Sequence, residues 1–202
     1  LAFLDITLRK PDRRLHDDSQ PLVSIAIPSY KPRYFARALQ SALDQSYRNI
    51  EVVICDDCPD DGIQRIAEEF VARDERVRYL RNPQRLRRDN LTKCFVEARG
   101  EFFRLLCDDD VLACDAVERM LDCYRRHPDI TLVTSRRRRI DENDQPLPDI
   151  FETQPPVTAD AVIEGLSLGS ALLTSLRNFV GEPTTAMFRK AEIAHIRPDY
   201  GS

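Results

Sequence analysis

Two clusters of aspartate each follow an apolar run of the chain. Asp56–Asp57 follows residues 50–55 (IEVVIC), and Asp108–Asp110 follows residues 102–106 (FFRLL). Several carboxylates brought into one crevice repel one another unless a positive charge lies among them. Magnesium and manganese take oxygen ligands, often one or two carboxylates together with the phosphates of a substrate. The two clusters therefore indicate a divalent metal site that takes a phosphate-bearing ligand.

Each cluster also has a simpler explanation. Aspartate is favoured at the start of a helix, and a helical pattern begins near Ala113, just after the triplet. A cap needs only one carboxylate, so three in succession favour ligand binding. Asp56–Asp57 precedes the turn-forming segment Pro59–Gly62, so a role in a turn and a role in a site remain equally open for this pair.

The elements that must position these carboxylates alternate in type along the chain. Short β-branched runs predict strands, and stretches with one apolar helical face predict helices. The expected strands are 22–27, 50–55, 77–80, 102–106 and 130–134, and the expected helices are 34–44, 63–73, 90–98 and 115–126. Pro28 is expected to end the first strand, and Gly100 to close the third helix. This alternation predicts an α/β fold with a mainly parallel sheet, in which both aspartate clusters lie beyond the carboxyl ends of strands.

The pattern changes after Thr134. Four arginines, Arg136–Arg139, lead into a proline-rich connection, beyond which a helix over 159–176 and a strand over 184–188 are expected. The arginines could neutralise a phosphate, but a solvated strand edge is the favoured explanation.

Composition excludes several classes of protein. The 202 residues are 42% hydrophobic and 32% charged, which is ordinary for a soluble globular chain. A net charge of −4 argues against nucleic acid as a partner, and no apolar run is long enough for a transmembrane segment. The six cysteines are expected to be reduced and structural, which favours a cytoplasmic location, with any membrane association coming from parts outside this chain.

Several segments follow one another in the order and spacing of a known family. They are 23–30 (VSIAIPSY), 39–47 (LQSALDQSY), 51–57 (EVVICDD), Asn90, 98–102 (ARGEF), the triplet at Asp108 and 183–190 (PTTAMFRK). Over residues 21–190 the chain resembles the family 2 glycosyltransferases, which have the GT-A fold, a Rossmann-like central sheet with helices on both faces. Because several motifs match in order, the resemblance is far more specific than any single motif.

The resemblance implies a site for the nucleotide of a sugar donor. In similar enzymes the acidic residue at the position of Asp57 accepts the N3–H of a uracil-type base, as a carboxylate can. Pro28 and Tyr30 lie where such enzymes form the wall and the stacking surface of the base pocket. Arg88, with Arg85 and Arg87, lies in a region that often contacts the diphosphate, although a solvent-facing role is equally open for each arginine.

The resemblance also implies a metal site at the triplet. The triplet corresponds to the DxD motif, which binds the donor's ribose and, through Mn²⁺ or Mg²⁺, its diphosphate. Cys107 stands where the family usually has aspartate. The ribose is therefore assigned to Asp108 and the metal chiefly to Asp109, with Asp108 and Asp110 as further candidate ligands.

The implied reaction moves a hexosyl or N-acetylhexosaminyl group from a nucleotide-diphosphate donor, expected to be a UDP-sugar, to an acceptor hydroxyl. The acceptor would be a saccharide, a lipid-linked molecule or another hydroxyl compound of polysaccharide biosynthesis. In similar inverting enzymes a carboxylate beyond the phenylalanine-arginine motif removes the acceptor's proton. Only Glu192 and Asp199 are acidic after Lys190, so we expect the general base beyond Ser202 and expect this chain to bind donor without transferring sugar.

Three segments and three alternatives follow from this interpretation. We expect an arm or linker at 1–20, a nucleotide-sugar-binding half at 21–140, and the start of an incomplete acceptor-side half at 141–202. A degenerate, non-catalytic nucleotide-sugar-binding module is the main alternative. A nucleotidyltransferase would carry a glycine-rich loop where 28–32 (PSYKP) has no glycine, and a phospho-acceptor receiver domain would carry its paired acids after the first strand.

Overall fold

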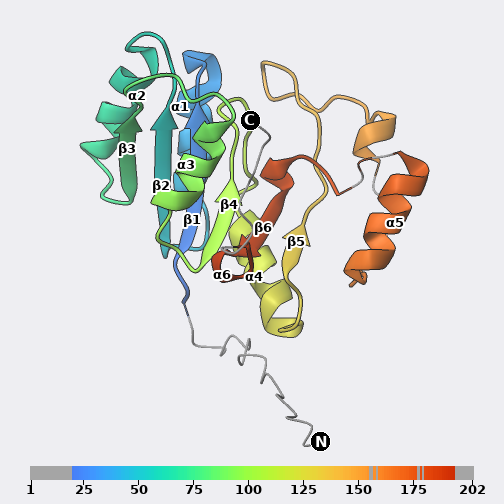
Figure 1. Ribbon diagram of the computed structural model, residues 1–202. Coiled ribbons are helices and arrows are strands. Elements are labelled where there is room, and N and C mark those ends of the chain that lie inside the picture. Colours follow the sequence, from blue (N-terminus) through green and yellow to red (C-terminus); the bar gives the residue numbers. More distant parts are fainter. Residues whose placement is uncertain (1–19, 155–156, 158, 177, 179, 194–202) are drawn as a thin grey trace, which may run out of the picture.

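The fold is built on one six-stranded sheet in the order β3-β2-β1-β4-β6-β5 (Figure 1). The computed structural model describes residues 20–154, 157, 159–176, 178 and 180–193. The strands are β1 (Val23–Ser29), β2 (Ile50–Asp56), β3 (Val77–Arg81), β4 (Phe102–Leu105), β5 (Leu132–Thr134) and β6 (Ala186–Arg189). The pairs among β1 to β4 are parallel, and β6 runs antiparallel to both β4 and β5. The predicted α/β fold with a mainly parallel sheet is confirmed.

Helices cover both faces of this sheet. They are α1 (Pro32–Leu43), α2 (Gly62–Val71), α3 (Asp89–Glu97), α4 (Ala116–Arg126), α5 (Gly165–Ser175) and α6 (Lys190–Ile193), with 3₁₀ turns η1 (Phe151–Thr153) and η2 (Pro183–Thr185). Successive residues of β1 enter different apolar clusters: Ile25 packs with residues of α1, α2 and α4, whereas Ala26 packs with Cys94 of α3. A strand buried on both faces must be apolar at nearly every position, as the sequence of β1 is.

β1 does not end at Pro28, as the sequence suggests, but continues to Ser29. The N–H of Val23 and the carbonyl of Ser29 both make hydrogen bonds toward β2. Because the backbone groups of successive residues in a parallel strand point to opposite neighbours, the nitrogen of Pro28 faces β4. There the pairing of β1 with β4 ends at Ala26 and Leu105. The missing N–H of proline therefore costs no ladder hydrogen bond.

The C-terminal elements differ from the expected ones. The helix expected over 159–176 extends only from Gly165 to Ser175, and it begins where Glu164 accepts hydrogen bonds from the N–H groups of Leu166 and Ser167. None of its side chains is buried, and it stands beside the sheet in Figure 1. The expected strand over 184–188 becomes turn η2 followed by β6. Within the described part of the chain, no helix has the length and hydropathy needed to cross a membrane.

The arginine run after β5 contacts acidic and carbonyl groups of the chain itself. Arg136 pairs with Asp149, Arg137 lies 3.8 Å from Glu182, and Arg139 donates to the carbonyl of Pro148 at 3.2 Å. β5 is the last strand of the sheet, so the run follows an edge strand, as the solvated-edge explanation expects.

Candidate functional site

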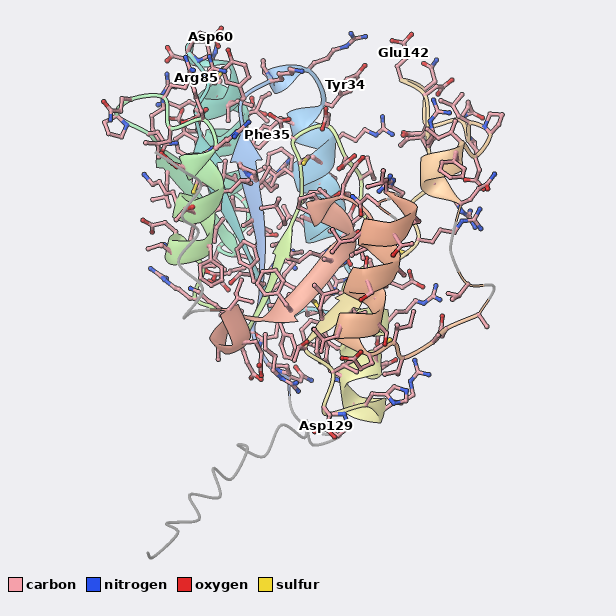
Figure 2. All side chains as sticks on the ribbon, turned by 45° about the vertical axis from the view of Figure 1, so that its right-hand side comes forward. Tyr34, Phe35, Asp60, Arg85, Asp129 and Glu142 are labelled. Carbon is pink, nitrogen blue, oxygen red and sulfur yellow. The ribbon has the colours of Figure 1, made fainter. Side chains whose placement is uncertain are left out.

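The predicted site residues meet beyond the carboxyl ends of β1, β2 and β4. In the sheet register Ser29 lies opposite Asp56, and the N–H of Asp57 donates to the carbonyl of Ser29 at 2.8 Å. On the other side of β1, the carboxylate of Asp108 contacts the backbone just past Ser29. Figure 2 shows Arg85 at this end of the molecule and Asp129, which precedes β5, at the opposite end. Both aspartate clusters therefore flank the end of β1.

Asp57 is 7% exposed and holds the loop between β3 and α3. Its Oδ1 accepts from Asn82 Nδ2 at 2.6 Å, its Oδ2 accepts from the N–H of Arg87 at 2.7 Å, and the N–H of Leu86 lies 3.0 Å from Oδ1 and 3.1 Å from Oδ2. These three donor groups make four contacts, which reach both oxygens of the carboxylate. Asn90 joins the same network through Asn82 and through the carbonyl of Cys55.

Asp56 has a different role from its neighbour. It is 1% exposed, its Oδ1 accepts from the N–H of Cys58 at 2.7 Å, and its Oδ2 accepts from the Tyr79 hydroxyl at 2.6 Å. Burial, followed by this bond to Asp56, raises the pKa of Tyr79. The turn explanation therefore holds for Asp56, whereas Asp57 borders a pocket.

That pocket has a volume of about 250 Å³ and lies between residues 57–59 and 81–85. Above the neighbouring half-buried Tyr30, the Arg85 guanidinium lies 4.1 Å from the ring centroid. The guanidinium covers one face of the ring, which shows that a planar group fits against that face. Pro28, also half-buried, precedes Tyr30 at the end of β1. The exposed Arg88 is the N-cap residue of α3, on the loop that Asp57 holds.

The three aspartates of the triplet point in different directions. Asp108 is buried, and its Oδ2 accepts from the N–H groups of Tyr30 at 2.6 Å and Lys31 at 2.7 Å. The exposed Asp109 and the half-buried Asp110 form a group with Cys107, in which the three ligand atoms lie within 4.8 Å of one another. Asp108 is not a member of that group.

The triplet does not cap the following helix. α4 begins at Ala116, and the side chain of its N-cap residue Asp115 makes no capping hydrogen bond. The N–H of Val117 in the first turn donates instead to Gln45 Oε1 at 3.0 Å. The capping alternative is therefore wrong, and the carboxylates of Asp109 and Asp110 remain unexplained by helix geometry.

The electrostatics of this group favour a cation. Burial raises the pKa of Asp110, as do the nearby charges of Asp109 and Glu182, while a hydrogen bond from Thr184 and the charge of Arg137 oppose the shift. Burial and the three aspartates raise the pKa of Cys107 to about 12, so its thiol is protonated at neutral pH. Two carboxylates suit Mg²⁺ or Mn²⁺, and a protonated thiol is a poor ligand for either. The donor set therefore fits a hard divalent cation held by Asp109 and Asp110.

Two contributors to the site were not selected from the sequence. Asn82 follows β3 directly, so the rule that site residues follow strand ends could have found it. Thr184, which helps to set the pKa of Asp110, lies in the segment 183–190 that carries the family resemblance, but no feature of that segment marks it as a site residue.

Comparisons with known proteins identify the family of the chain. The sequence profile described as glycosyl transferase family 2 matches residues 24–191, and the chain therefore belongs to this family. It is 37% identical over 122 residues to the chondroitin synthase of Escherichia coli, a match covering 60% of this chain and 18% of that protein.

Two solved structures share the fold. The structure of S. aureus TarS 1–349 superposes with a TM-score of 0.60 at 19% identity, covering 85% of this chain and 48% of that one. The mannosyltransferase PcManGT from Pyrobaculum calidifontis, in complex with GDP-Man and Mn²⁺, superposes with a TM-score of 0.53 at 20% identity, covering 63% of this chain and 39% of that one. This chain thus spans less than half the length of these proteins.

Proposed function

We propose that this chain binds a nucleoside diphosphate sugar beyond the ends of β1, β2 and β4 and presents it for transfer to an acceptor hydroxyl. One observation carries the proposal. Asp57 borders a pocket at the end of β2, the carboxylates of Asp109 and Asp110 lie past β4, and Asp108 joins the loop after β4 to Tyr30. A base-sized pocket and a cation-binding pair on either side of one strand suit the two ends of a nucleoside diphosphate.

The base is assigned to the pocket beside Asp57. A carboxylate suits an imide N–H donor such as N3–H of uracil, which would compete with the Leu86 N–H that is divided between the two Asp57 oxygens. Tyr30 offers a ring face on which the Arg85 guanidinium now stacks at 4.1 Å, and a base would take or share that face. Pro28, at the end of β1, is assigned to the wall next to Tyr30. The structures of TarS with UDP and with UDP-GlcNAc support a uridine nucleotide, whereas PcManGT, which shares the fold, was solved with GDP-Man.

The diphosphate and ribose are assigned to the triplet. Asp109 and Asp110 would hold Mn²⁺ or Mg²⁺, as the Mn²⁺ in the PcManGT complex supports. When bound, the metal supplies a Lewis acid that stabilises negative charge on the leaving diphosphate. Asp108 Oδ2 is engaged by two backbone N–H groups, so Oδ1 is assigned to a ribose hydroxyl. Arg88 is the candidate diphosphate contact from the β3–α3 loop.

Binding and turnover test the proposal separately. Calorimetric titrations with UDP, GDP and ADP in Mn²⁺ should give the tightest binding for UDP. Equal affinities for all three would contradict the base assignment. UDP release from UDP-sugars, measured with and without saccharide acceptors, then separates a transferase from a nucleotide-sugar-binding module. Tight nucleotide binding with no UDP release in the presence of any acceptor would favour the nucleotide-sugar-binding module.

A further inference from the structure

The loop between β3 and α3, residues 82–88, is fastened beside the proposed base pocket at two places. At one place, the Leu86 N–H is divided between the two oxygens of Asp57, at 3.0 and 3.1 Å. At the other place, the Arg85 guanidinium lies 4.1 Å from the centroid of the Tyr30 ring. Both contacts occupy groups that the proposed function assigns to the nucleobase.

The contact of Arg85 excludes a base from the same face of Tyr30. Arg85 lines the pocket, so the ring face that it covers is on the pocket side. At 4.1 Å a guanidinium is in direct contact with the ring, and no second planar group fits between the two. A base that stacks on this face must therefore displace the guanidinium.

The contact of Leu86 limits the access of a base N–H to Asp57. The buried Asp57 carboxylate also accepts from Asn82 Nδ2 at 2.6 Å and from the Arg87 N–H at 2.7 Å. The two contacts of the Leu86 N–H are longer than both of these. Hydrogen bonds weaken with distance, so Leu86 is the donor that an incoming N–H displaces most easily.

Two features of the fastened loop oppose it. Arg87 has a φ of 56°, in the left-handed region that costs free energy for any residue but glycine. Asn82 Oδ1 is buried and has no hydrogen-bond partner within the described part of the chain, which is also unfavourable. The Asn82 amide cannot turn round to find one, because its Nδ2 donates to oxygens of Asp57 and Asn90 at 2.6 and 2.9 Å.

We propose that residues 82–88 form a latch, which is closed in the absence of nucleotide and which the nucleobase must open. The base takes the ring face of Tyr30 from Arg85. Its N–H takes the place of the Leu86 N–H at Asp57. The inference rests on the proposed function, because it presupposes that this pocket binds the base.

The strain in the closed latch keeps the free energy of opening small. Once the loop moves, Arg87 can leave the left-handed region and Asn82 Oδ1 can accept a hydrogen bond from water. The latch is therefore poised between two arrangements. Ligand affinity is reduced by the fraction of the chain that is already open, so a weaker latch gives tighter binding of the base.

Uridine affinity tests the contact of Arg85 with Tyr30, followed in the whole chain by chemical-shift titration. Uridine has no phosphate for the guanidinium to attract, and Arg85 is exposed, so Arg85→Ala should fold. This variant should bind uridine about 2- to 5-fold more tightly, the change that corresponds to a cation–π contact at an exposed site. Arg65→Ala, which removes an exposed arginine of α2, should bind as the wild type does. Unchanged or weaker binding of uridine to Arg85→Ala would overturn the proposal.

Amide hydrogen exchange, resolved by residue, tests the contact of Leu86 with Asp57. A bound ligand ordinarily slows exchange around its site, whereas saturating UDP should speed exchange of the Leu86 N–H about 2- to 10-fold, as the loss of one hydrogen bond does. The internal control is the Asn82 N–H, which donates to the carbonyl of Asp56 at 3.0 Å and should not exchange faster. Unchanged or slower exchange of the Leu86 N–H in saturating UDP would also overturn the proposal.

The latch and the proposed function fail in different ways. If UDP binds the wild type and Asp57→Ala weakens that binding, but either latch test gives the contrary result, only the latch fails. If neither uridine nor UDP binds the wild-type chain, the base assignment of the proposed function fails and the latch fails with it.

Discussion

The Asp108 carboxylate accepts a hydrogen bond from the backbone N–H of Tyr30 at 2.6 Å, across 78 positions of sequence. The same oxygen accepts from the N–H of Lys31 at 2.7 Å. One side chain after β4 therefore fixes the backbone after β1, where the proposed stacking residue stands. This contact joins the proposed base pocket to the proposed metal-binding pair.

Asp108→Ala should lower the free energy of unfolding by about 2 kcal/mol, because hydrogen bonds to a charged group contribute about 1.5–3 kcal/mol. It should also weaken UDP binding in the absence of metal, because Tyr30 is no longer held. Denaturant unfolding and calorimetry measure the two effects. The control is Asp109→Ala, an exposed neighbour whose loss should change stability by less than about 0.5 kcal/mol. Equal stability losses in the two variants would show that the contact contributes nothing.

Asp57→Ala should weaken the binding of UDP by about 1.5–3 kcal/mol, which is the range for a hydrogen bond to a charged group. The loop between β3 and α3 also loses its anchor, so its amides, including those of Leu86 and Arg87, should exchange hydrogen faster. Asp60→Ala, an exposed change in the adjacent turn, is the matched control for UDP affinity. Unchanged UDP affinity in Asp57→Ala would mean that the carboxylate serves only the loop.

Neither the aspartate pair nor the aspartate triplet could be resolved from the sequence alone. The apolar runs predicted β1, β2 and β4, because a sheet covered on both faces needs such runs, and they placed both clusters at one end of the sheet. The sequence did not show where each side chain points. Asp56 contacts Tyr79 and Asp108 contacts the backbone of Tyr30, and both contacts depend on distant segments.

Gly100 was assigned to a helix end, and the structure gives it another role. α3 ends at Glu97 with Ala98 as its C-cap residue. A Cβ on Gly100 would lie 2.6 Å from the nitrogen of Ser24 and 2.7 Å from the carbonyl of Leu22, so the backbone there has no room for one. The glycine is needed because the chain passes close to β1, a contact that helix-ending rules do not describe.

Gly100→Ala should therefore lower stability by about 1–3 kcal/mol or more, as overpacking against fixed backbone does. Gly169→Ala is the matched control, since nothing lies within 4 Å of its added Cβ inside α5. Alanine in a helix interior is favoured over glycine by about 1 kcal/mol, so that variant should be as stable as the wild type or more so. Thermal midpoints decide the comparison. A stable Gly100→Ala would contradict the close approach.

Glu51, which lies far from the site, should make the free energy of unfolding depend on pH. Burial alone would raise its pKa, but hydrogen bonds from Ser24, the N–H of Arg99 and Arg78 lower the pKa below its ordinary value of 4.5. A lowered pKa in the folded state stabilises the fold above about pH 4.5, and that contribution is lost as the pH falls through the folded value.

The check is the difference in free energy of unfolding between wild type and Glu51→Gln, measured from pH 7 to pH 3. The difference should be largest at neutral pH. It should shrink as the pH falls below about 4.5, where the unfolded state binds the proton, and should level off below the folded pKa, where both states bind it. A difference that stays constant over this range would mean that the carboxylate is not stabilised in its charged form.

The central claim is that Asp57 and the pair Asp109 and Asp110 bind the two ends of one nucleoside diphosphate. Calorimetric titration of UDP with and without Mn²⁺, in wild type and Asp109→Asn, tests it most directly. Asp109 is exposed, so its change should leave the thermal midpoint in place. The account predicts that Mn²⁺ tightens UDP binding to the wild type and that Asp109→Asn removes this gain. UDP affinity that is independent of Mn²⁺ in the wild type, or an unchanged gain in Asp109→Asn, would contradict it.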